Sequence, residues 1–226
     1  MKLSIIIPVY NEEKTILEII KRVKKVNIKG VLKEIIVVND GSTDQTKQNL
    51  AKVQDIKLIN LTKNQGKGAA LRTGFRQAKG DYVLIQDADL EYDPKDIPSL
   101  INPIINKKAE IIYGSRFLGP HKNMLFWHLM GNKFLSLITN ILFNTTLSDM
   151  EVGYKVIPRK LLNSLNLKQN RFGFEPEVTA KLLKKGHRIY EVPISYAGRE
   201  FHEGKKITWR DGVIAFFLLF KYRLFN

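Results

Sequence analysis

The sequence contains no cysteine, which excludes disulfides and metal sites built from thiolates. Long hydrophobic runs are also missing. The longest uninterrupted apolar stretch, Val213 to Phe220, has eight residues, whereas a helix that spans a bilayer needs about 18 or more. The apolar run at the N-terminus is too short for a signal peptide. We therefore expect a soluble or peripheral chain that does not span a membrane by itself.

Acidic residues are few compared with basic ones: 22 Asp and Glu face 37 Lys and Arg, a net charge of +15. Such a surplus attracts polyanions, among them nucleic acid, anionic lipid headgroups and phosphorylated ligands, and the charge alone does not choose between them. The apolar fraction of 44% is ordinary for a globular protein. With 226 residues and no low-complexity linker or internal repeat, the chain is expected to form one domain.

Apolar segments alternate with helical patterns through the first half of the chain. We expect buried strands at 3–7, 34–38, 57–61, 82–85 and 110–113. Pro8 is expected to end the first strand, because proline has no N–H to donate. Alternating strands and helices predict an α/β fold with a mostly parallel sheet. Each strand runs into polar residues or glycine, at the sheet edge where α/β proteins bind ligands.

The pair Asp87 and Asp89 follows the strand expected at 82–85. Carboxylates are rarely buried without a partner, so core packing does not explain them. A divalent cation held between these acids and a nucleotide diphosphate would satisfy them, since hard cations prefer oxygen ligands. A solvated loop is the alternative for an isolated pair of this kind.

The segment 124–143 is strongly apolar, with a narrow polar stripe at Lys133, Ser136, Asn140 and Asn144. Two interpretations stay open. The segment forms a helix pair buried against the domain, or it lies in a membrane interface, with Trp127 at headgroup depth. The last helix, expected at 208–225, is rich in aromatic residues and raises the same question.

Several motifs occur in a characteristic order along the chain: Pro8-Val9-Tyr10-Asn11-Glu12, Val38-Asn39-Asp40-Gly41-Ser42-Thr43-Asp44, Lys63-Asn64-Gln65-Gly66-Lys67-Gly68, Asp87-Ala88-Asp89, Gly114-Ser115-Arg116 and Asp149-Met150-Glu151-Val152-Gly153-Tyr154. In this order they resemble family 2 glycosyltransferases of the GT-A fold, and more narrowly the branch that transfers mannose or glucose to dolichyl or polyprenyl phosphate. The resemblance runs from residue 3 to about 211.

The resemblance implies a Rossmann-like, mostly parallel sheet flanked by helices, with amphipathic interface helices in the C-terminal half. Within a single domain, residues 1–118 would bind the nucleotide sugar and 119–226 the acceptor. The donor would be GDP-mannose or UDP-glucose. The residues implied for donor binding are Pro8, Tyr10, Glu12, Asp40, Lys67, Asp87 and Ala88. For Glu12, a charge at a helix N-terminus is an alternative, and for Lys67 a solvated side chain.

The same resemblance assigns Mg²⁺ or Mn²⁺ to Asp87 and Asp89, with Glu91 as a further ligand unless its side chain turns outward. The metal would stabilise charge on the departing nucleoside diphosphate. For the acceptor phosphate we expect Arg116 and Arg199, because guanidinium groups suit phosphate oxygens.

Further acceptor contacts are expected from Lys133 and from Lys205, in a segment that resembles the family's mobile loop. Asp149 is assigned orientation of the sugar or the acceptor, not proton abstraction. The catalytic residues implied are thus Asp89, Arg116, Asp149 and Arg199.

The function implied is inverting transfer of a hexose from a nucleotide sugar to a polyprenyl phosphate. A phosphate acceptor is largely dianionic at neutral pH and needs no general base. The enzyme would sit at an anionic membrane surface on the cytoplasmic side, with a separate membrane-protein partner left open. The alternative is transfer to a hydroxyl, which requires a base. Nucleic-acid binding is not expected, because carboxylates crowd the sheet edge.

Overall fold

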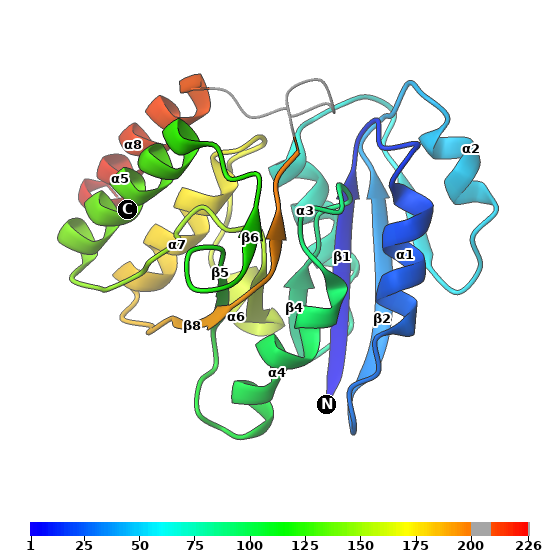
Figure 1. The fold of residues 1–226 in the computed structure, drawn as a ribbon, viewed down its shortest axis with the longest axis horizontal. Coiled ribbons are helices and arrows are strands. Elements are labelled where there is room, and N and C mark those ends of the chain that lie inside the picture. Colours follow the sequence, from blue (N-terminus) through cyan, green and yellow to red (C-terminus); the bar gives the residue numbers. More distant parts are fainter. Residues whose placement is uncertain (200–208, 226) are drawn as a thin grey trace.

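The structure is a computed structural model, and it describes residues 1–199 and 209–225. A seven-stranded sheet in the order β3-β2-β1-β4-β7-β5-β8 forms the centre (Figure 1). Its strands are β1 (Lys2–Val9), β2 (Leu32–Asn39), β3 (Lys57–Asn60), β4 (Tyr82–Ile85), β5 (Ile112–Ser115), β7 (Lys155–Pro158) and β8 (Tyr190–Pro193). All neighbouring strands run parallel except β7, which is antiparallel to β4 and β5. The predicted α/β class with a mostly parallel sheet is confirmed.

A second sheet pairs β6 (His121–Lys122) with β9 (Tyr196–Ala197). The helices are α1 (Ile16–Lys25), α2 (Thr46–Ala51), α3 (Lys67–Gln77), η1 (Pro94–Asp96), α4 (Ile97–Ile105), α5 (Phe126–Phe143), α6 (Arg159–Ser164), α7 (Phe174–Lys184) and α8 (Trp209–Leu224). Helix α3 packs on β1 and β2, and α8 packs against both α5 and α7. In Figure 1, α5 and α8 lie side by side at one end of the sheet.

Strand β1 lies between β2 and β4, and it does not stop at Pro8 as expected. It continues to Val9, with Pro8 opposite Val38 of β2. On its other side, pairing with β4 ends at Ile6. The missing N–H of Pro8 therefore breaks no ladder contact with β4, which is why proline is tolerated there. The extra length carries the chain directly into Tyr10 and Glu12.

The composition of the core explains why the strands in the first half of the chain could be predicted from the sequence. Side chains of β1, β2 and β4, such as Ile5, Ile36 and Leu84, are almost completely buried. Strands covered on both faces by helices consist of continuous aliphatic runs. A smaller cluster, which includes Leu135, Leu219 and Tyr222, joins α5 and α8 to the domain.

Helix α5 is a single helix, and several of its polar side chains face the protein, whereas Lys133 is exposed. Asn132, Ser136 and Asn140, spaced four residues apart on one face, contact Arg116 and the segment 147–150: Ser136 Oγ accepts from the Met150 N–H at 3.0 Å, and Asn140 bonds both backbone groups of Leu147. Of the two interpretations left open, a helix pair is wrong, because one helix covers 126–143. On another side of the helix, apolar side chains such as Leu137 and Ile141 are exposed.

The outward face of α5 and α8 carries large apolar side chains. Trp127 is 80% exposed, Trp209 76% and Ile141 68%. Nevertheless, among helices in the described ranges, none combines the length and apolar character required to cross a bilayer.

Candidate active site

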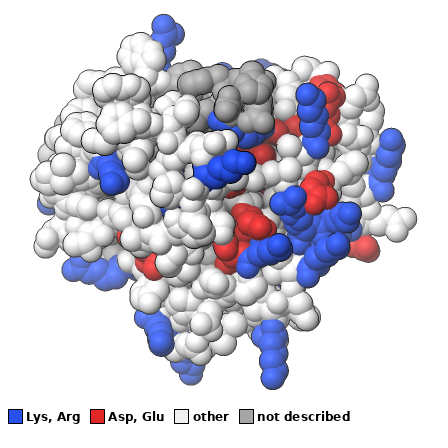
Figure 2. Space-filling view, viewed as in Figure 1, with Lys and Arg blue, Asp and Glu red and all other residues white. Residues whose placement is uncertain are grey.

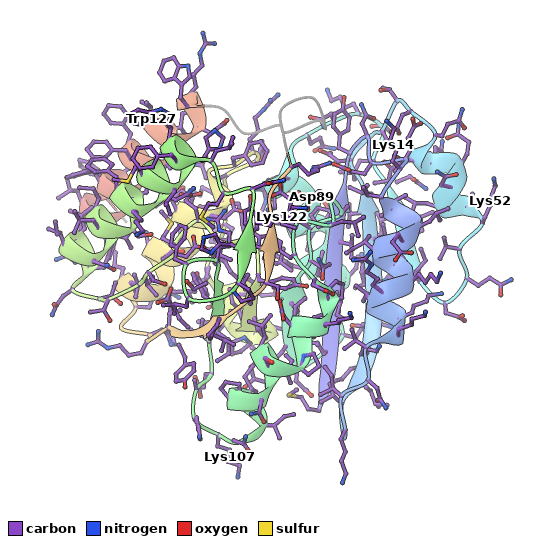
Figure 3. All side chains as sticks on the ribbon, viewed as in Figure 1. Lys14, Lys52, Asp89, Lys107, Lys122 and Trp127 are labelled. Atoms are coloured by element: carbon purple, nitrogen blue, oxygen red, sulfur yellow. The ribbon has the colours of Figure 1, made fainter. Side chains whose placement is uncertain are left out.

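A cavity of about 1080 Å³ opens where β1, β2 and β4 end. One end is polar and is lined by residues that follow these strands, including Glu12, Asp40 and Asp87. The other end is apolar and is lined by α5 and α8, including Trp127 and Phe216. In Figure 2, acidic side chains gather near the middle of this face, whereas the part over α5 is mostly uncharged. Figure 3 shows Asp89 near the centre and Trp127 at the outer edge.

Asp87 lies beside Lys67, at the start of α3. The Lys67 Nζ is 2.8 Å from Oδ1 and 3.1 Å from Oδ2 of Asp87, and 2.9 Å from Oε1 of Glu175. Burial lowers the pKa of Lys67, but the charges of Asp87 and Glu175 outweigh it, so this pKa lies well above its ordinary value. Lys67 is therefore a charged, partly buried ammonium between two acids. It is not a solvated lysine.

Asp89 lies in a second cluster of charges, together with Glu12, Glu91 and Arg199. The Arg199 guanidinium bonds both oxygens of Glu12 at 3.1 Å and lies 3.4 Å from Asp89. Glu91 accepts from the Arg199 N–H at 3.0 Å and from the Tyr196 hydroxyl at 3.2 Å. Burial and the charges of Glu91 and Asp87 raise the pKa of Asp89 to about 7. Arg199 thus faces the acids of the donor side, while its role toward an acceptor stays a prediction.

The chemistry of Asp87 and Asp89 fits a divalent cation. The Asp89 carboxylate lies close enough to Asp87 and Glu91 for their charges to raise its pKa, and a divalent cation would offset this accumulation of negative charge. Within residues 1–199 and 209–225, no three acidic, histidine or cysteine side chains form a ready-made metal cage. Mg²⁺ is commonly held by one or two carboxylates and completed by substrate phosphates and water. Asp87 and Asp89 suit that arrangement, and Glu91 stays a predicted third ligand.

Gly153 leaves the space that Asp87 occupies. A Cβ at this position would lie 2.3 Å from Asp87 Oδ2 and 3.0 Å from the Tyr92 ring. The Gly153 N–H also donates to the Tyr92 hydroxyl at 3.1 Å, which holds the two segments together. The glycine of the 149–154 motif is therefore required by contact with the aspartate.

Substituting Gly153→Ala is expected to displace the Asp87 carboxylate while the fold is retained. A misplacement of about 1 Å in a reacting site costs on the order of 10²-fold in rate. Mn²⁺ affinity in the presence of nucleotide should fall, with an unchanged circular dichroism spectrum. Gly131→Ala is the matched control, because no atom lies within 4 Å of an added Cβ there. Unchanged Mn²⁺ affinity in Gly153→Ala would contradict this geometry.

Arg116 and Asp149 form a buried ion pair. Arg116 Nε and one terminal nitrogen each lie 2.6 Å from an oxygen of Asp149, and the Arg116 backbone N–H adds a bond of 3.1 Å. Asp149 is completely buried. Burial lowers the pKa of Arg116, but the Asp149 charge more than offsets it, so this pKa is raised. Among the described residues that line the cavity, Arg116 is present and Asp149 is not. Asp149 is therefore connected to the cavity through its bonds to Arg116.

The predicted nucleoside side comes together at one end of the cavity, where Pro8, Tyr10, Glu12, Asp40 and Ala88 are among the lining residues. Asp40 uses both carboxylate oxygens on the chain itself, accepting from the N–H groups of Gln65 and Gly66 at 2.8 Å. Its first role is to hold the loop that leads to Lys67.

Gly66 has a φ of +98°, and an added Cβ would lie 2.4 Å from the Asn170 carbonyl oxygen. The backbone therefore approaches the segment 169–171 at this glycine. Gly66 also lines the cavity.

Of the two predicted acceptor lysines, only Lys133 belongs to the part of the chain that the structure describes. Lys133 is exposed on α5, 6.0 Å from the Phe117 ring centre, and it is absent from the described cavity lining. Its neighbour Asn132 lines the cavity and lies 3.4 Å from Arg116. Lys205 lies outside the described residues. Both lysines stay predictions.

Sequence reasoning missed Glu151 and Glu175, which line the cavity. Burial, followed by the charge of Glu175, raises the pKa of Glu151 to about 8. Nearby, fully buried Lys155 donates to the carbonyl oxygens of Met150 and Val152 and so shapes the 149–153 segment. Glu175 sits in the first turn of α7, where acids are common for electrostatic reasons alone, so its sequence position carried no distinct signal.

A family profile decides which family the chain belongs to. The glycosyl transferase family 2 profile matches residues 4–165. The chain belongs to this family. The predicted resemblance is confirmed, and with it the prediction that the chain is a glycosyltransferase.

Relatives of this glycosyltransferase include the dolichol-phosphate mannosyltransferase of Pyrococcus furiosus, with 31% identity over 91% of this chain and 59% of that protein. The dodecaprenyl-phosphate galacturonate synthase of Rhizobium johnstonii is 26% identical over 88% of this chain and 60% of that protein. The chain thus spans about three fifths of the length of these two relatives.

Among solved structures, glucosyl-3-phosphoglycerate synthase from Mycobacterium tuberculosis, in complex with Mn²⁺, UDP and phosphoglyceric acid, superposes with a TM-score of 0.78. The match covers 100% of this chain and 79% of that chain at 19% identity. It confirms the GT-A fold of this family 2 glycosyltransferase.

Proposed function

We propose that this glycosyltransferase transfers a hexose from a nucleotide sugar, GDP-mannose or UDP-glucose, to a polyprenyl or dolichyl phosphate, with inversion and with Mg²⁺ or Mn²⁺. The relatives named for dolichol phosphate and dodecaprenyl phosphate support this acceptor class. Structural neighbours crystallised with UDP and Mn²⁺ or Mg²⁺ support the use of a divalent metal. We place the reaction at the cytoplasmic face of the membrane, because nucleotide sugars and a basic, anion-attracting surface would meet there.

The single observation that carries the proposal is the continuity of the cavity. Its polar end gathers Asp87, Asp89 and Arg116, and its apolar end lies between α5 and α8, near Trp127 and Phe216. A lipid phosphate has the same two parts, an anionic head and an apolar chain. Such an acceptor uses both ends of the cavity at once.

The outward apolar face of α5 and α8 supports binding of the protein to a membrane surface. On α5, Ser136 and Asn140 bond the protein, whereas Trp127 and Ile141 are 80% and 68% exposed. A helix in water turns its polar face outward. The reverse orientation suits an interface where apolar side chains enter the acyl region and tryptophans lie at headgroup level.

The reaction requires little covalent chemistry from the protein. An acceptor phosphate oxygen forms a bond to the anomeric carbon as the bond from that carbon to the donor diphosphate breaks, and the nucleoside diphosphate leaves. A divalent metal bound at Asp87 and Asp89 would stabilise the charge of the leaving group. Arg116, oriented by Asp149, would offset the charge of the acceptor phosphate.

Transfer to a hydroxyl acceptor is the competing function, and it needs a general base. Asp149, the acid considered for that role from the sequence, is fully buried and spends both oxygens on Arg116. This arrangement favours an acceptor that arrives already ionised.

The test is incubation of the chain with polyprenyl phosphate vesicles and a panel of radiolabelled nucleotide sugars. Label should move into the lipid phase with at least one donor, and EDTA should abolish the transfer. Label that moves only to a soluble saccharide acceptor would overturn the lipid assignment. Transfer that is unchanged in EDTA would overturn the metal assignment.

Membrane docking is tested separately by sedimentation with anionic vesicles at low salt. Replacing Trp127 and Phe217 by serine removes two side chains that are 80% and 65% exposed on the apolar face. Burial of one such side chain is worth about 1.5–3 kcal/mol, so binding should fall at least ~10-fold. Leu32→Ser is the control, because Leu32 is 74% exposed at the start of β2. Equal binding by all three proteins would contradict docking through α5 and α8.

A further inference from the structure

Lys67 occupies the position next to Asp87 that a metal ion would need. Its ammonium has three N–H donors, and three carboxylate oxygens lie within 3.1 Å: both oxygens of Asp87 and Oε1 of Glu175. The Lys67 side chain is only 17% exposed. A divalent cation bound at Asp87 would be placed close to this ammonium, and at such distances like charges in a partly buried site repel strongly.

The Glu175 carboxylate can accept a further hydrogen bond. Its residue exposure is 4%, and its Oε2 is buried without a hydrogen-bond partner in the structure. A buried carboxylate oxygen left unpaired is costly and calls for an explanation. An ammonium that moved from Asp87 towards Glu175 would supply the missing bond. Glu175 also lines the cavity, so the movement stays inside the site.

We propose that Lys67 is a resident counter-ion of Asp87 that excludes divalent metal until the donor diphosphate arrives. The diphosphate then takes one side of the ammonium, Glu175 takes the other, and Asp87 is freed for the metal. Metal and nucleotide therefore bind cooperatively. This inference rests on the proposed function, in that the donor is a nucleotide sugar.

A variant that leaves the net charge of the site unchanged can distinguish a specific role of Lys67 from a general effect of charge on cation binding. Removing Lys67 alone would favour any cation, and it would leave Asp87 and Glu175 as adjacent unpaired acids that endanger folding. The double variant Lys67→Met/Glu175→Gln removes one positive and one negative charge, so the net charge of the site is unchanged. Methionine keeps an unbranched apolar stem of similar length. Lys63→Met is the matched control, because Lys63 is exposed on the loop before α3 and lies outside the described cavity lining.

The experiment measures free Mn²⁺ by electron paramagnetic resonance, with protein alone and with saturating GDP or UDP. It requires no turnover. In the unmodified protein, nucleotide should raise Mn²⁺ affinity on the order of 10²-fold, within the usual range of coupling between two ligands. In the double variant, Mn²⁺ alone should bind on the order of 10-fold more tightly, and the gain from nucleotide should shrink correspondingly. Lys63→Met should behave as the unmodified protein does.

Two results would overturn the inference. If the double variant is folded and keeps the full gain from nucleotide, Lys67 is not the barrier, and the proposed function stands. If neither GDP nor UDP raises Mn²⁺ affinity in the unmodified protein, the inference and the proposed nucleotide-sugar donor both fail.

Discussion

Replacing Asp89 by asparagine is expected to lower the rate of hexose transfer about 10³-fold or more, without loss of stability. Metal stabilisation of a leaving group is worth several kcal/mol, and each ~1.4 kcal/mol is a factor of ten in rate. The fold should tolerate the change, because Asp89 is buried beside Asp87 and Glu91 and its charge is disfavoured there. An active site that carries such strain gains stability when the strain is removed.

The measurement pairs initial rates of lipid-linked product formation with the midpoint of thermal unfolding. Asp93→Asn is the matched control: Asp93 lies four residues further along the same loop, caps η1, and is not part of the described cavity lining. Asparagine is also a good N-cap, so this control should keep both rate and stability. An Asp89→Asn rate within tenfold of the unmodified protein, or a markedly lower unfolding midpoint, would count against the assignment.

The second large effect is expected at the buried pair of Arg116 and Asp149. Arg116→Met leaves Asp149, which is 0% exposed, without its charged partner. Breaking a buried pair in this way costs about 3–5 kcal/mol of stability. Transfer should fall further than stability alone explains, because no guanidinium then faces the acceptor phosphate. Binding of nucleotide with Mn²⁺ should be retained.

Denaturant unfolding of Arg116→Met, Asp149→Asn and the double variant checks this prediction. The double variant should recover much of the stability lost in Arg116→Met, because no unpaired charge remains buried, but it should stay inactive. Arg188→Met is the control, since Arg188 is exposed and contacts only the Asn144 carbonyl oxygen among the described bonds. Equal loss of nucleotide binding and of transfer in the folded double variant would contradict an acceptor role for Arg116.

The strands in the first half of the chain could be predicted from the sequence because each depends on a short run of neighbouring residues. A strand buried on both faces is a continuous aliphatic run, and β4 was predicted with its observed bounds, Tyr82–Ile85. Polar residues after such a run must lie at the carboxyl edge of a parallel sheet. The meeting of Asp87, Asp40 and Glu12 at one cavity could therefore be predicted without coordinates.

The orientation of α5 was harder to predict, because a helical pattern does not indicate which face of the helix packs against the protein. The sequence shows a narrow polar stripe at Lys133, Ser136, Asn140 and Asn144. Of these, Ser136 and Asn140 bond the 147–150 segment, whereas the other two are exposed. The pattern indicates two faces, and only the neighbouring segment decides which one turns inward.

By itself, the sequence determined the α/β class, the place of the acids at the sheet edge, and membership of the glycosyltransferase family. These properties depend on residue order and on periodicities of a few residues. The tertiary structure decided which charges are partners: Lys67 with Asp87 and Glu175, Arg116 with Asp149, and Arg199 with Glu12. These partners are separated by 20 to 187 positions. The energy of an ion pair depends on distance and burial in space, and neither is written in the spacing along the chain.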